Sequence, residues 1–368
     1  MRINCNKNEL QKSVNTVIKA VPVKSPVYLL EGIRIQAMND KLTLFGSDGT
    51  LSIKCTQDAV VSEPGEAVLT ARIFNELLSK LDAADLTLYT EGNNVVMECG
   101  SSRTTLCYMD AEQYPAFPEY DKEKPVLLLS RQLVSMVSQT VFATSVSEDK
   151  PILTGILLEY ESSQFKMVAL DGYRLAIRQE TLPVEINIKD VVVPAKSMRE
   201  MAHIIPDDDT SISLFASENM ISIVCDNVEI VTRVLQGDYV KYKSILPAEH
   251  ATRMIILRQA LLNSLERASI LARQSKTNLV NLRIEKDVLT ISSDSEVGKV
   301  REEVGINLTG KNLDIAFNAR YLLDVLKEVD DDEIVMDFNT NISPCVIHPI
   351  KGNSYLYLVL PVKTSTVN

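Results

Sequence analysis

Hydrophobic positions along the chain follow a pattern of helix, strand, turn and strand that occurs three times. Apolar residues with helical spacing begin near residues 7, 131 and 258, and segments of alternating apolar and polar residues follow each of them. In every copy an aspartate stands in a short polar break between two such segments, "FGSDGT", "VALDGY" and "ISSDSE". These aspartates, Asp48, Asp171 and Asp294, are spaced 123 residues apart. The constant spacing predicts three tandem copies of one domain, each with a turn at its aspartate.

The same pattern predicts two helices in each copy. Their windows are 7–20, 71–81, 131–145, 195–205, 258–273 and 319–329. Thr70, Ser130 and Asn318 directly precede three of these windows and are typical N-cap residues. We expect domains at 1–123, 124–247 and 248–368, with linkers at 118–125 and 246–252. The predicted fold class is α+β, with two helices packed on antiparallel sheets of roughly eight strands in every domain.

The composition is that of an ordinary soluble globular protein, with 368 residues, 45% hydrophobic and 24% charged. The first residues lack the apolar core of a signal peptide, and no apolar run approaches the roughly 18 residues that span a bilayer. We therefore expect a cytoplasmic protein without a membrane partner. The six cysteines show no metal-ligand spacing and are expected to be free thiols. For the acidic runs 207–209 and 330–332, solvated turns are favoured over metal sites.

The net charge of −11 argues against a nucleic-acid partner, but the charge is unevenly distributed. The helical windows hold 13 basic and six acidic residues, whereas the rest of the chain holds 25 basic and 43 acidic residues. Helix propensity does not explain this excess, and the helix dipole explains only cations at helix ends. A basic helical surface on an acidic protein fits a polyanion bound through its phosphates. The candidate residues on the helices are Lys12, Lys80, Lys196, Arg199 and Arg267.

Motifs for catalysis are weak. The segment 305–312 differs from a P-loop by Asn312, which stands where a Ser or Thr would meet magnesium, and its pattern predicts two strands joined by a turn. The histidines, His203, His250 and His348, lie in different domains or in loops, without a visible catalytic partner. We expect no catalytic residue, metal or cofactor. Two alternatives remain open: a nucleotide-binding enzyme that depends on Lys311, and a monomeric repeat scaffold that binds only proteins.

Four short motifs, together with the threefold repeat, resemble one family. They are "VALDGYRLAI" at 168–177, "GDYVKYKSILP" at 237–247, "NARYLLDVL" at 318–326 and "YLVLPVKT" at 357–364. The chain resembles the beta subunits of bacterial DNA polymerase III, the sliding clamps, over its whole length. The resemblance implies a closed ring of two copies joined head to tail, with strands outside and helices lining a central hole that holds duplex DNA.

The resemblance also implies DNA contacts and partners. Lys24 and Arg72 match positions where family members contact DNA, and weak phosphate contacts would let the ring slide without reading sequence. Ile270 and Leu271 precede a polar turn and are expected in a homodimer interface between domain 1 of one copy and domain 3 of the other. The implied partners are double-stranded DNA, the DNA polymerase III catalytic subunit, an ATP-driven clamp loader and other proteins with clamp-binding motifs.

In the family, such partners dock peptides rich in Gln, Leu and Phe into an apolar pocket of the clamp. The leucines would bury the peptide anchor, Gly172 would let the backbone turn, and Tyr173 and Arg174 would supply rim contacts. The run 239–242 and Ser244 depart from the residues common in the family, so the preferred peptide is expected to differ. The residues that match the pocket are Leu153, Leu170, Gly172, Tyr173, Arg174, Leu175, Val240, Ile245, Ile342, Pro344, Leu358, Leu360, Pro361 and Val362.

Overall fold

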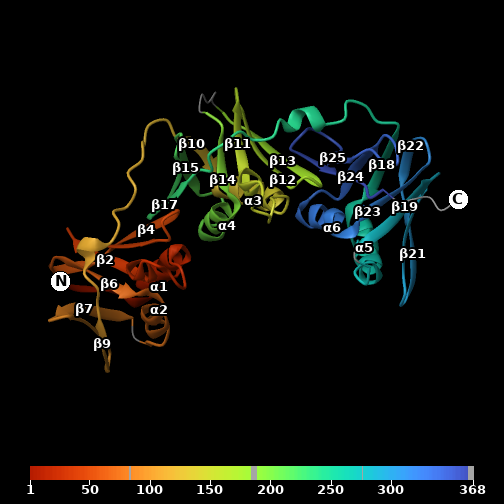
Figure 1. Cartoon of the computed structure of the whole chain (residues 1–368). Coiled ribbons are helices and arrows are strands. Elements are labelled where there is room, and N and C mark those ends of the chain that lie inside the picture. The colour runs from red at the N-terminus through yellow and green to blue at the C-terminus, as the bar shows by residue number, and fades with distance from the viewer. Residues whose placement is uncertain (83, 184–188, 276, 364–368) are drawn as a thin grey trace. The chain divides into compact units, whose positions relative to one another are not determined.

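The computed structural model describes residues 1–82, 84–183, 189–275 and 277–363, and Figure 1 labels its elements. Each helical window predicted from the sequence contains a helix. Thr364, the last residue of the terminal motif, lies outside the described residues. The helices are α1 (Lys7–Val17), α2 (Ala71–Ser79), α3 (Ser130–Val141), α4 (Ala195–Ile204), α5 (Arg258–Ala272) and α6 (Ala319–Glu328).

The predicted helix caps have different outcomes. Asn318 caps α6, because its Oδ1 accepts a hydrogen bond from the backbone N–H of Arg320 at 3.0 Å. Thr70 occupies the N-cap position of α2, but its side chain makes no capping bond with the described residues. Ser130 is itself the first residue of α3, and its hydroxyl donates to the backbone oxygen of Asp208 at 2.9 Å. That bond ties the start of α3 to the acidic loop at 207–209.

The strands of the first compact unit, which comprises residues 1–131 and 200–234, form two antiparallel sheets. Helix α1 packs on β3 and β4 of the larger sheet and against α2. The five-stranded sheet has the order β5 (Val60–Glu63), β1 (Arg2–Asn6), β7 (Asp85–Glu91), β8 (Asn94–Cys99) and β9 (Ser102–Cys107). The eight-stranded sheet has the order β10 (Val126–Leu129), β15 (Ser211–Ala216), β16 (Met220–Cys225), β17 (Val228–Arg233), β4 (Leu51–Asp58), β3 (Lys41–Ser47), β2 (Gly32–Met38) and β6 (Gly65–Thr70).

The second compact unit begins at residue 132, continues to 199, and resumes at 235. Helix α5 packs on β19, β20 and β21 and against α6. The nine-stranded sheet has the order β14 (Val191–Pro194), β11 (Gly155–Glu161), β12 (Gln164–Leu170), β13 (Arg174–Thr181), β26 (Tyr355–Val359), β25 (Cys345–Pro349), β24 (Glu333–Phe338), β18 (Thr252–Leu257) and β22 (Asn307–Gly310). The four-stranded sheet has the order β21 (Gly298–Gly305), β20 (Val288–Ser295), β19 (Leu279–Glu285) and β23 (Leu313–Asn318).

Consecutive repeats share sheets across their boundaries. Strand β17 of the second repeat pairs with β4 of the first, with Ile230 opposite Ile53. Strand β13 of the second repeat pairs with β26 of the third, with Leu175 opposite Leu358. Pairing of this kind satisfies backbone groups that would otherwise be exposed at a sheet edge. Each compact unit therefore combines elements of neighbouring repeats.

The aspartate turns agree with the prediction in two repeats and differ in the third. Asp171 Oδ1 accepts the backbone N–H groups of Tyr173 at 2.9 Å and Arg174 at 3.0 Å, and Asp48 makes the equivalent pair of bonds. Such a side chain stabilises a turn locally. In the third repeat the prediction is wrong, because Asp294 lies within β20 and pairs with Lys299 at 2.6 Å. The hairpin there continues to Ser295 opposite Gly298, so the turn comes later.

The segment that resembles a P-loop forms strands, as predicted. Strand β21 ends at Gly305, β22 ends at Gly310, and β23 begins at Leu313. No helix follows the glycines, so the backbone lacks the strand-to-helix turn that cradles phosphates in a P-loop. Strands β22 and β23 belong to different sheets. Among the helices described, none is long and apolar enough to cross a membrane.

Candidate functional site

Arg174 lies at the end of the "DGYRL" turn, and its side chain is buried. Its Nε donates to Asp171 Oδ2 at 3.1 Å, its Nη1 to Asp324 Oδ2 at 2.5 Å, and its Nη2 to the backbone oxygen of Phe142 at 2.6 Å. The guanidinium also lies over the Tyr321 ring, 4.8 Å from its centroid. With only 8% of Arg174 exposed, the predicted rim contact is replaced by a positioning role. The residue connects the turn to α6 and to the end of α3.

Leucines from distant parts of the chain form a buried row behind this turn. Leu175 on β13 lies opposite Leu170 on β12 and opposite Leu358 on β26. Directly opposed residues of neighbouring strands share one face of a sheet. Leu153, from the 3-10 helix Pro151–Thr154, packs into the same cluster. The structure thus brings together four predicted pocket residues, but Leu175 is only 1% exposed. These leucines form a buried apolar floor beneath the turn.

Exposed apolar side chains lie at the margin of this floor. Of the predicted residues, Tyr173, Val240, Ile245, Ile342 and Leu360 are exposed, and Pro344, Pro361 and Val362 are half-buried. The backbone N–H of Leu360 donates to the oxygen of Tyr173 at 2.9 Å, so the terminal segment remains paired with the turn beyond β26. Gly172 has φ +93°, a backbone conformation that glycine adopts without a steric penalty. Exposed apolar residues beside a buried apolar floor are typical of a binding site.

The segment that departs from the family pattern anchors the loop next to the floor. The hydroxyl of Tyr239 donates to the backbone oxygen of Val168 at 3.3 Å, and that of Tyr242 donates to Glu159. Lys243 Nζ lies 2.6 Å from the same carboxylate. Burial and the Glu159 carboxylate raise the pKa of Tyr242, and the hydrogen bond to Glu159 raises the pKa of Lys243. The two tyrosines hold the loop in place, a role that a comparison of motifs does not reveal.

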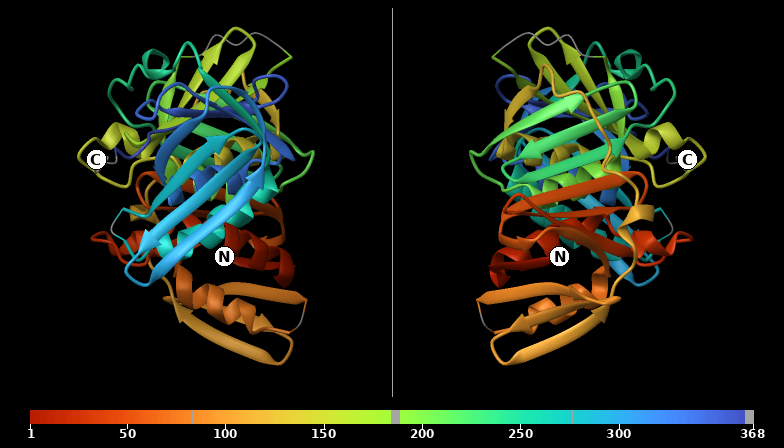
Figure 2. Two further views of the ribbon diagram at one scale, coloured as in Figure 1. Left: turned by 90° about the vertical axis from the view of Figure 1, so that its right-hand side faces the viewer. Right: turned by 90° about the vertical axis from the view of Figure 1, so that its left-hand side faces the viewer.

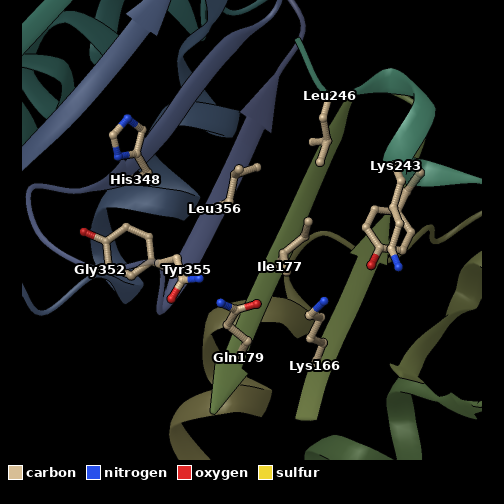
Figure 3. Close-up of a pocket in the computed structure, with 11 residues that line it drawn as sticks. Lys166, Ile177, Gln179, Lys243, Leu246, His348, Gly352, Tyr355 and Leu356 are labelled. Carbon is tan, nitrogen blue, oxygen red and sulfur yellow. The ribbon is translucent and has the colours of Figure 1, made fainter. Parts of the chain in front are cut away.

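A cavity of about 410 Å³ continues the apolar face of the sheet. Its apolar wall includes Ile177 and Leu356, the next opposed pair on the same face after Leu175 and Leu358. Figure 3 shows this pair on neighbouring strands, with Lys166 toward one end. The other lining residues are Gln179, Tyr242, Lys243, Leu246, His348, Gly352, Asn353 and Tyr355. The predicted site residues do not line this cavity, although Ile177 belongs to the "VALDGYRLAI" motif.

Two of the three histidines meet at one carboxylate near the cavity, a cluster that the sequence did not reveal. His348 Nε2 lies 3.0 Å from Asp337 Oδ2, and His250 Nδ1 lies 3.7 Å from it. Arg253 donates to both oxygens of Asp337 at 2.8 Å. The hydrogen bond to Asp337 raises the pKa of His348. Although burial opposes the effect, the bonds from Arg253 and His348 hold the pKa of Asp337 below its usual range.

This cluster lacks the features of a metal or catalytic centre. In the part of the chain that the structure describes, no group of three His, Cys, Asp or Glu side chains could hold a metal ion. The cysteines are thiols rather than disulfides and are mostly buried, and burial raises the pKa of Cys5 to about 12. A thiol with a raised pKa is a poor nucleophile near neutral pH.

The predicted DNA-binding residues are exposed, but some of them have acidic partners. Arg267 donates to both oxygens of Glu302, at 2.9 Å and 2.5 Å. Arg72 and Lys12 pair with Glu76 and Glu9 of their own helices, at 3.0 Å and 2.9 Å. Carboxylates therefore offset part of the positive charge of the helices. The predicted residues, all exposed on the first or the second compact unit, are Lys12, Lys24, Arg72, Lys80, Lys196, Arg199 and Arg267.

The predicted interface residues lie at the end of α5. Ile270 is 62% exposed, which is unusual for a large aliphatic side chain within a helix. Leu271 is half-buried. It lies beside Gly298, at the start of β21, where a larger residue would place its Cβ 3.9 Å from Leu271 Cδ1. Ile270 is thus the more accessible of the two, and Leu271 packs beside the hairpin of β20 and β21.

Tandem α+β repeats that share antiparallel sheets define a protein of the DNA-clamp class. Family models of the DNA polymerase III beta subunit match the chain in three consecutive parts: the N-terminal domain over residues 1–118, the central domain over 128–241, and the C-terminal domain over 243–363. The chain belongs to the DNA polymerase III beta subunit family, and its function is that of a DNA sliding clamp.

Individual relatives match nearly the whole chain. The beta sliding clamp of Staphylococcus epidermidis is 30% identical over 375 residues, covering 99% of this chain and 100% of the relative. That of Staphylococcus aureus is 32% identical over 362 residues, covering 95% and 96%. The crystal structure of the DNA polymerase sliding clamp from Bacillus subtilis has a TM-score of 0.97 at 31% identity, covering 99% and 100%. The similarity therefore extends over all three repeats.

Proposed function

We propose that two copies of this chain close head to tail into a ring around duplex DNA, and that the ring tethers replication proteins through the apolar site at the "DGYRL" turn. The observation that carries the tethering role is the exposed apolar pair Tyr173 and Leu360, which are joined by a backbone hydrogen bond and flank the buried leucine row. Proposed partners are the DNA polymerase III catalytic subunit, the clamp loader and other proteins with clamp-binding motifs. The role requires no catalytic group, metal or cofactor, and it belongs in the cytoplasm.

The proposed domains are those of the sequence repeat, 1–123, 124–247 and 248–368. Ring closure would pair domain 1 of one copy with domain 3 of the other. Two strands support this pairing, because β9 and β21 each stand at the end of their sheet with many exposed residues. Their outer backbone groups are available for a further strand. Ile270 is exposed on α5, which packs beside β21, and would contribute apolar surface to the same interface.

Retention on DNA would be topological. A closed ring needs only weak phosphate contacts, since it cannot leave a duplex sideways, and such contacts carry no sequence information. Exposed cations on several helices suit this task better than one strong site. Lys24 is exposed, so its charge is available to a phosphate. Paired cations such as Arg267 would contribute less.

The test compares loaded clamps on a nicked circle and on the same DNA after linearisation. We expect the labelled protein to stay on the circle and to run off the linear ends. The double variant Lys24→Glu and Arg72→Glu should load poorly and become more sensitive to salt. A matched charge reversal, Lys41→Glu on β3, should load normally. Equal loss from circular and linear DNA would contradict the proposal.

A further inference from the structure

A cavity of about 640 Å³ lies on the four-stranded sheet of the third repeat. Helix α5 packs on this sheet, and Figure 2 shows the light-blue strands in front of that helix in the left view. The exposed positions of β19 and β20 alternate with buried ones, so their side chains point away from α5. The residues that line the cavity are Asn281, Leu282, Arg283, Thr290, Ser292, Arg301, Asp314, Ile315, Ala316, Asn341, Ile342 and Lys363.

The pairing of the strands explains why the sheet is hollow here. One row of opposed residues crosses the sheet from Arg301 through Ser292 and Asn281 to Ala316. Three members of this row, Ser292, Asn281 and Ala316, have short side chains, and only Arg301 at one end has a long one. In the next row of that face, Thr290 lies opposite Arg283, which lies opposite Asp314. The hollow is therefore polar and has cations around it.

Positive charge predominates in the lining of this hollow, although the chain has a net charge of −11. The lining contains Arg283, Arg301 and Lys363 but only one carboxylate, that of Asp314. Arg283 gives its Nε–H to Asp314 Oδ1 at 2.9 Å, so the other four N–H donors of the guanidinium can reach a ligand. Arg283 and Lys363 are exposed. A carboxylate ligand would find charge-assisted donors here.

The hollow adjoins the terminal segment of the apolar site. Ile342, an exposed residue that the family resemblance assigned to the apolar site, is also part of the lining of the hollow. Lys363 follows directly on the terminal segment that contains Leu360. The backbone N–H of Val362 donates to the oxygen of Ala316 at 2.8 Å, which fixes that segment beside β23. A peptide bound at Leu360 would therefore have its flanking residues close to Arg283 and Lys363.

We propose that this hollow binds acidic residues that flank the apolar anchor of a partner peptide. The inference rests on the proposed function, because the anchor must first occupy the apolar site. A peptide fits the surface better than a nucleic acid does. The hollow borders apolar residues, and Asp314 beside Arg283 and Glu303 beside Arg301 would repel a continuous row of phosphates. Single aspartates or glutamates of a peptide can contact Arg283 or Arg301 while avoiding Asp314 and Glu303.

Calorimetry with three synthetic peptides tests the proposal. All carry one Gln-Leu-Phe-type anchor, and they differ in having three aspartates before it, three after it, or serines on both sides. At low salt we expect one acidic peptide to bind about tenfold more tightly than the serine peptide, the effect of one net charge-assisted contact. High salt should remove this advantage. Since the direction of the bound peptide decides which flank reaches the hollow, both acidic peptides are needed.

Variants locate the effect in the hollow. Arg283→Gln with Lys363→Gln should abolish the acidic advantage without changing affinity for the serine peptide. Asp314→Asn should increase the advantage, because it removes the competing carboxylate. Lys41→Gln is the matched control, since Lys41 is an exposed strand cation paired with Asp58 at 2.5 Å, and should change nothing. Arg301 stays unmodified because β21 is the proposed interface strand.

The outcomes separate this inference from the proposed function. If the three peptides bind the native protein equally well, the flank proposal is overturned and the apolar site stands. An acidic advantage that persists in the Arg283→Gln and Lys363→Gln variant would also overturn it. If no peptide binds, the proposed apolar site fails together with the inference. If the double variant binds peptides normally and loses affinity for duplex DNA instead, the hollow belongs to nucleic acid.

Discussion

The guanidinium of Arg174 and the carboxylate of Asp324 lie 2.5 Å apart, although 150 positions separate the two residues in the sequence. The pair joins the turn before β13 to helix α6, and so joins the second repeat to the third. The same guanidinium holds Asp171, which shapes the turn, at 3.1 Å. Removing Arg174 would therefore leave two carboxylates without their common partner.

We expect Arg174→Ala to lower the free energy of unfolding by about 3 kcal/mol, as is typical when one partner of a buried ion pair is removed. Arg320→Ala is the matched control, because Arg320 approaches the same Asp324 at 3.8 Å with a side chain that is 75% exposed. Its loss should cost less than about 1 kcal/mol. Urea denaturation followed by circular dichroism measures both. Equal effects would show that burial of Arg174 adds nothing.

Leu360→Ala should weaken binding of an anchor peptide by about tenfold, since burying a leucine contributes roughly 1.5 to 3 kcal/mol and part of this side chain is already covered. The dimer and the fold should be unaffected, because Leu360 lies at the surface. Leu175→Ala should behave differently and destabilise the fold by about 2 to 5 kcal/mol, as expected for a buried leucine. Calorimetry with thermal denaturation separates the two effects. Full peptide affinity in Leu360→Ala would reject the assignment.

Ile270→Asp should convert the proposed dimer into folded monomers, because it places a charge on a surface that would be buried between copies. Light scattering should give a mass near 41.0 kDa for the variant and about twice that value for the native protein. Val240→Asp is the control, since Val240 is exposed on the loop at the apolar site. If the native protein instead has the mass of a single chain, the measurement would favour a monomeric repeat scaffold.

The stability of the protein should depend on His348 in a defined pH range. Its pKa is raised in the folded protein by Asp337, so the stabilisation is fully present below the unfolded pKa of about 6.5 and is lost as pH rises through the higher folded pKa. His250 and Arg253 face the same carboxylate, so their charges also act on Asp337. Urea midpoints from pH 5.5 to 9 should fall in the native protein and vary less in His348→Gln. Identical slopes would exclude a contribution from His348.

Local pattern was sufficient to predict the helices and two of the three aspartate turns. Helical spacing identifies an amphipathic helix without tertiary information, and an Asp-Gly pair supplies both the side-chain acceptor and the positive φ that a tight turn requires. The third turn differs because no glycine follows Asp294 directly, and the hairpin continues to Ser295 opposite Gly298. The constant spacing of the aspartates therefore predicts the three repeats correctly, but it does not fix the local conformation at each aspartate.

The site was harder to predict because its parts depend on pairings between distant strands. The resemblance suggested which residues belong to it, but the pattern did not show that Leu175 lies under the surface or that Arg174 turns inward. His250 and His348 meet at Asp337 only because of the long-range packing around β24 and β25. The hollow at Arg283 likewise depends on a row of residues from four strands, of which the sequence shows only separate segments.

The position of β26 between β13 and β25 has a mechanical consequence. A tethered partner that moves relative to the clamp would pull on the chain near Leu360, just beyond the end of this strand. A force along β26 would load its hydrogen bonds to both neighbouring strands in shear, so that many bonds share it at once. Peeling would have to begin at a sheet edge, far from the point of attachment. The strand next to the proposed attachment point is thus among those best able to resist being pulled out.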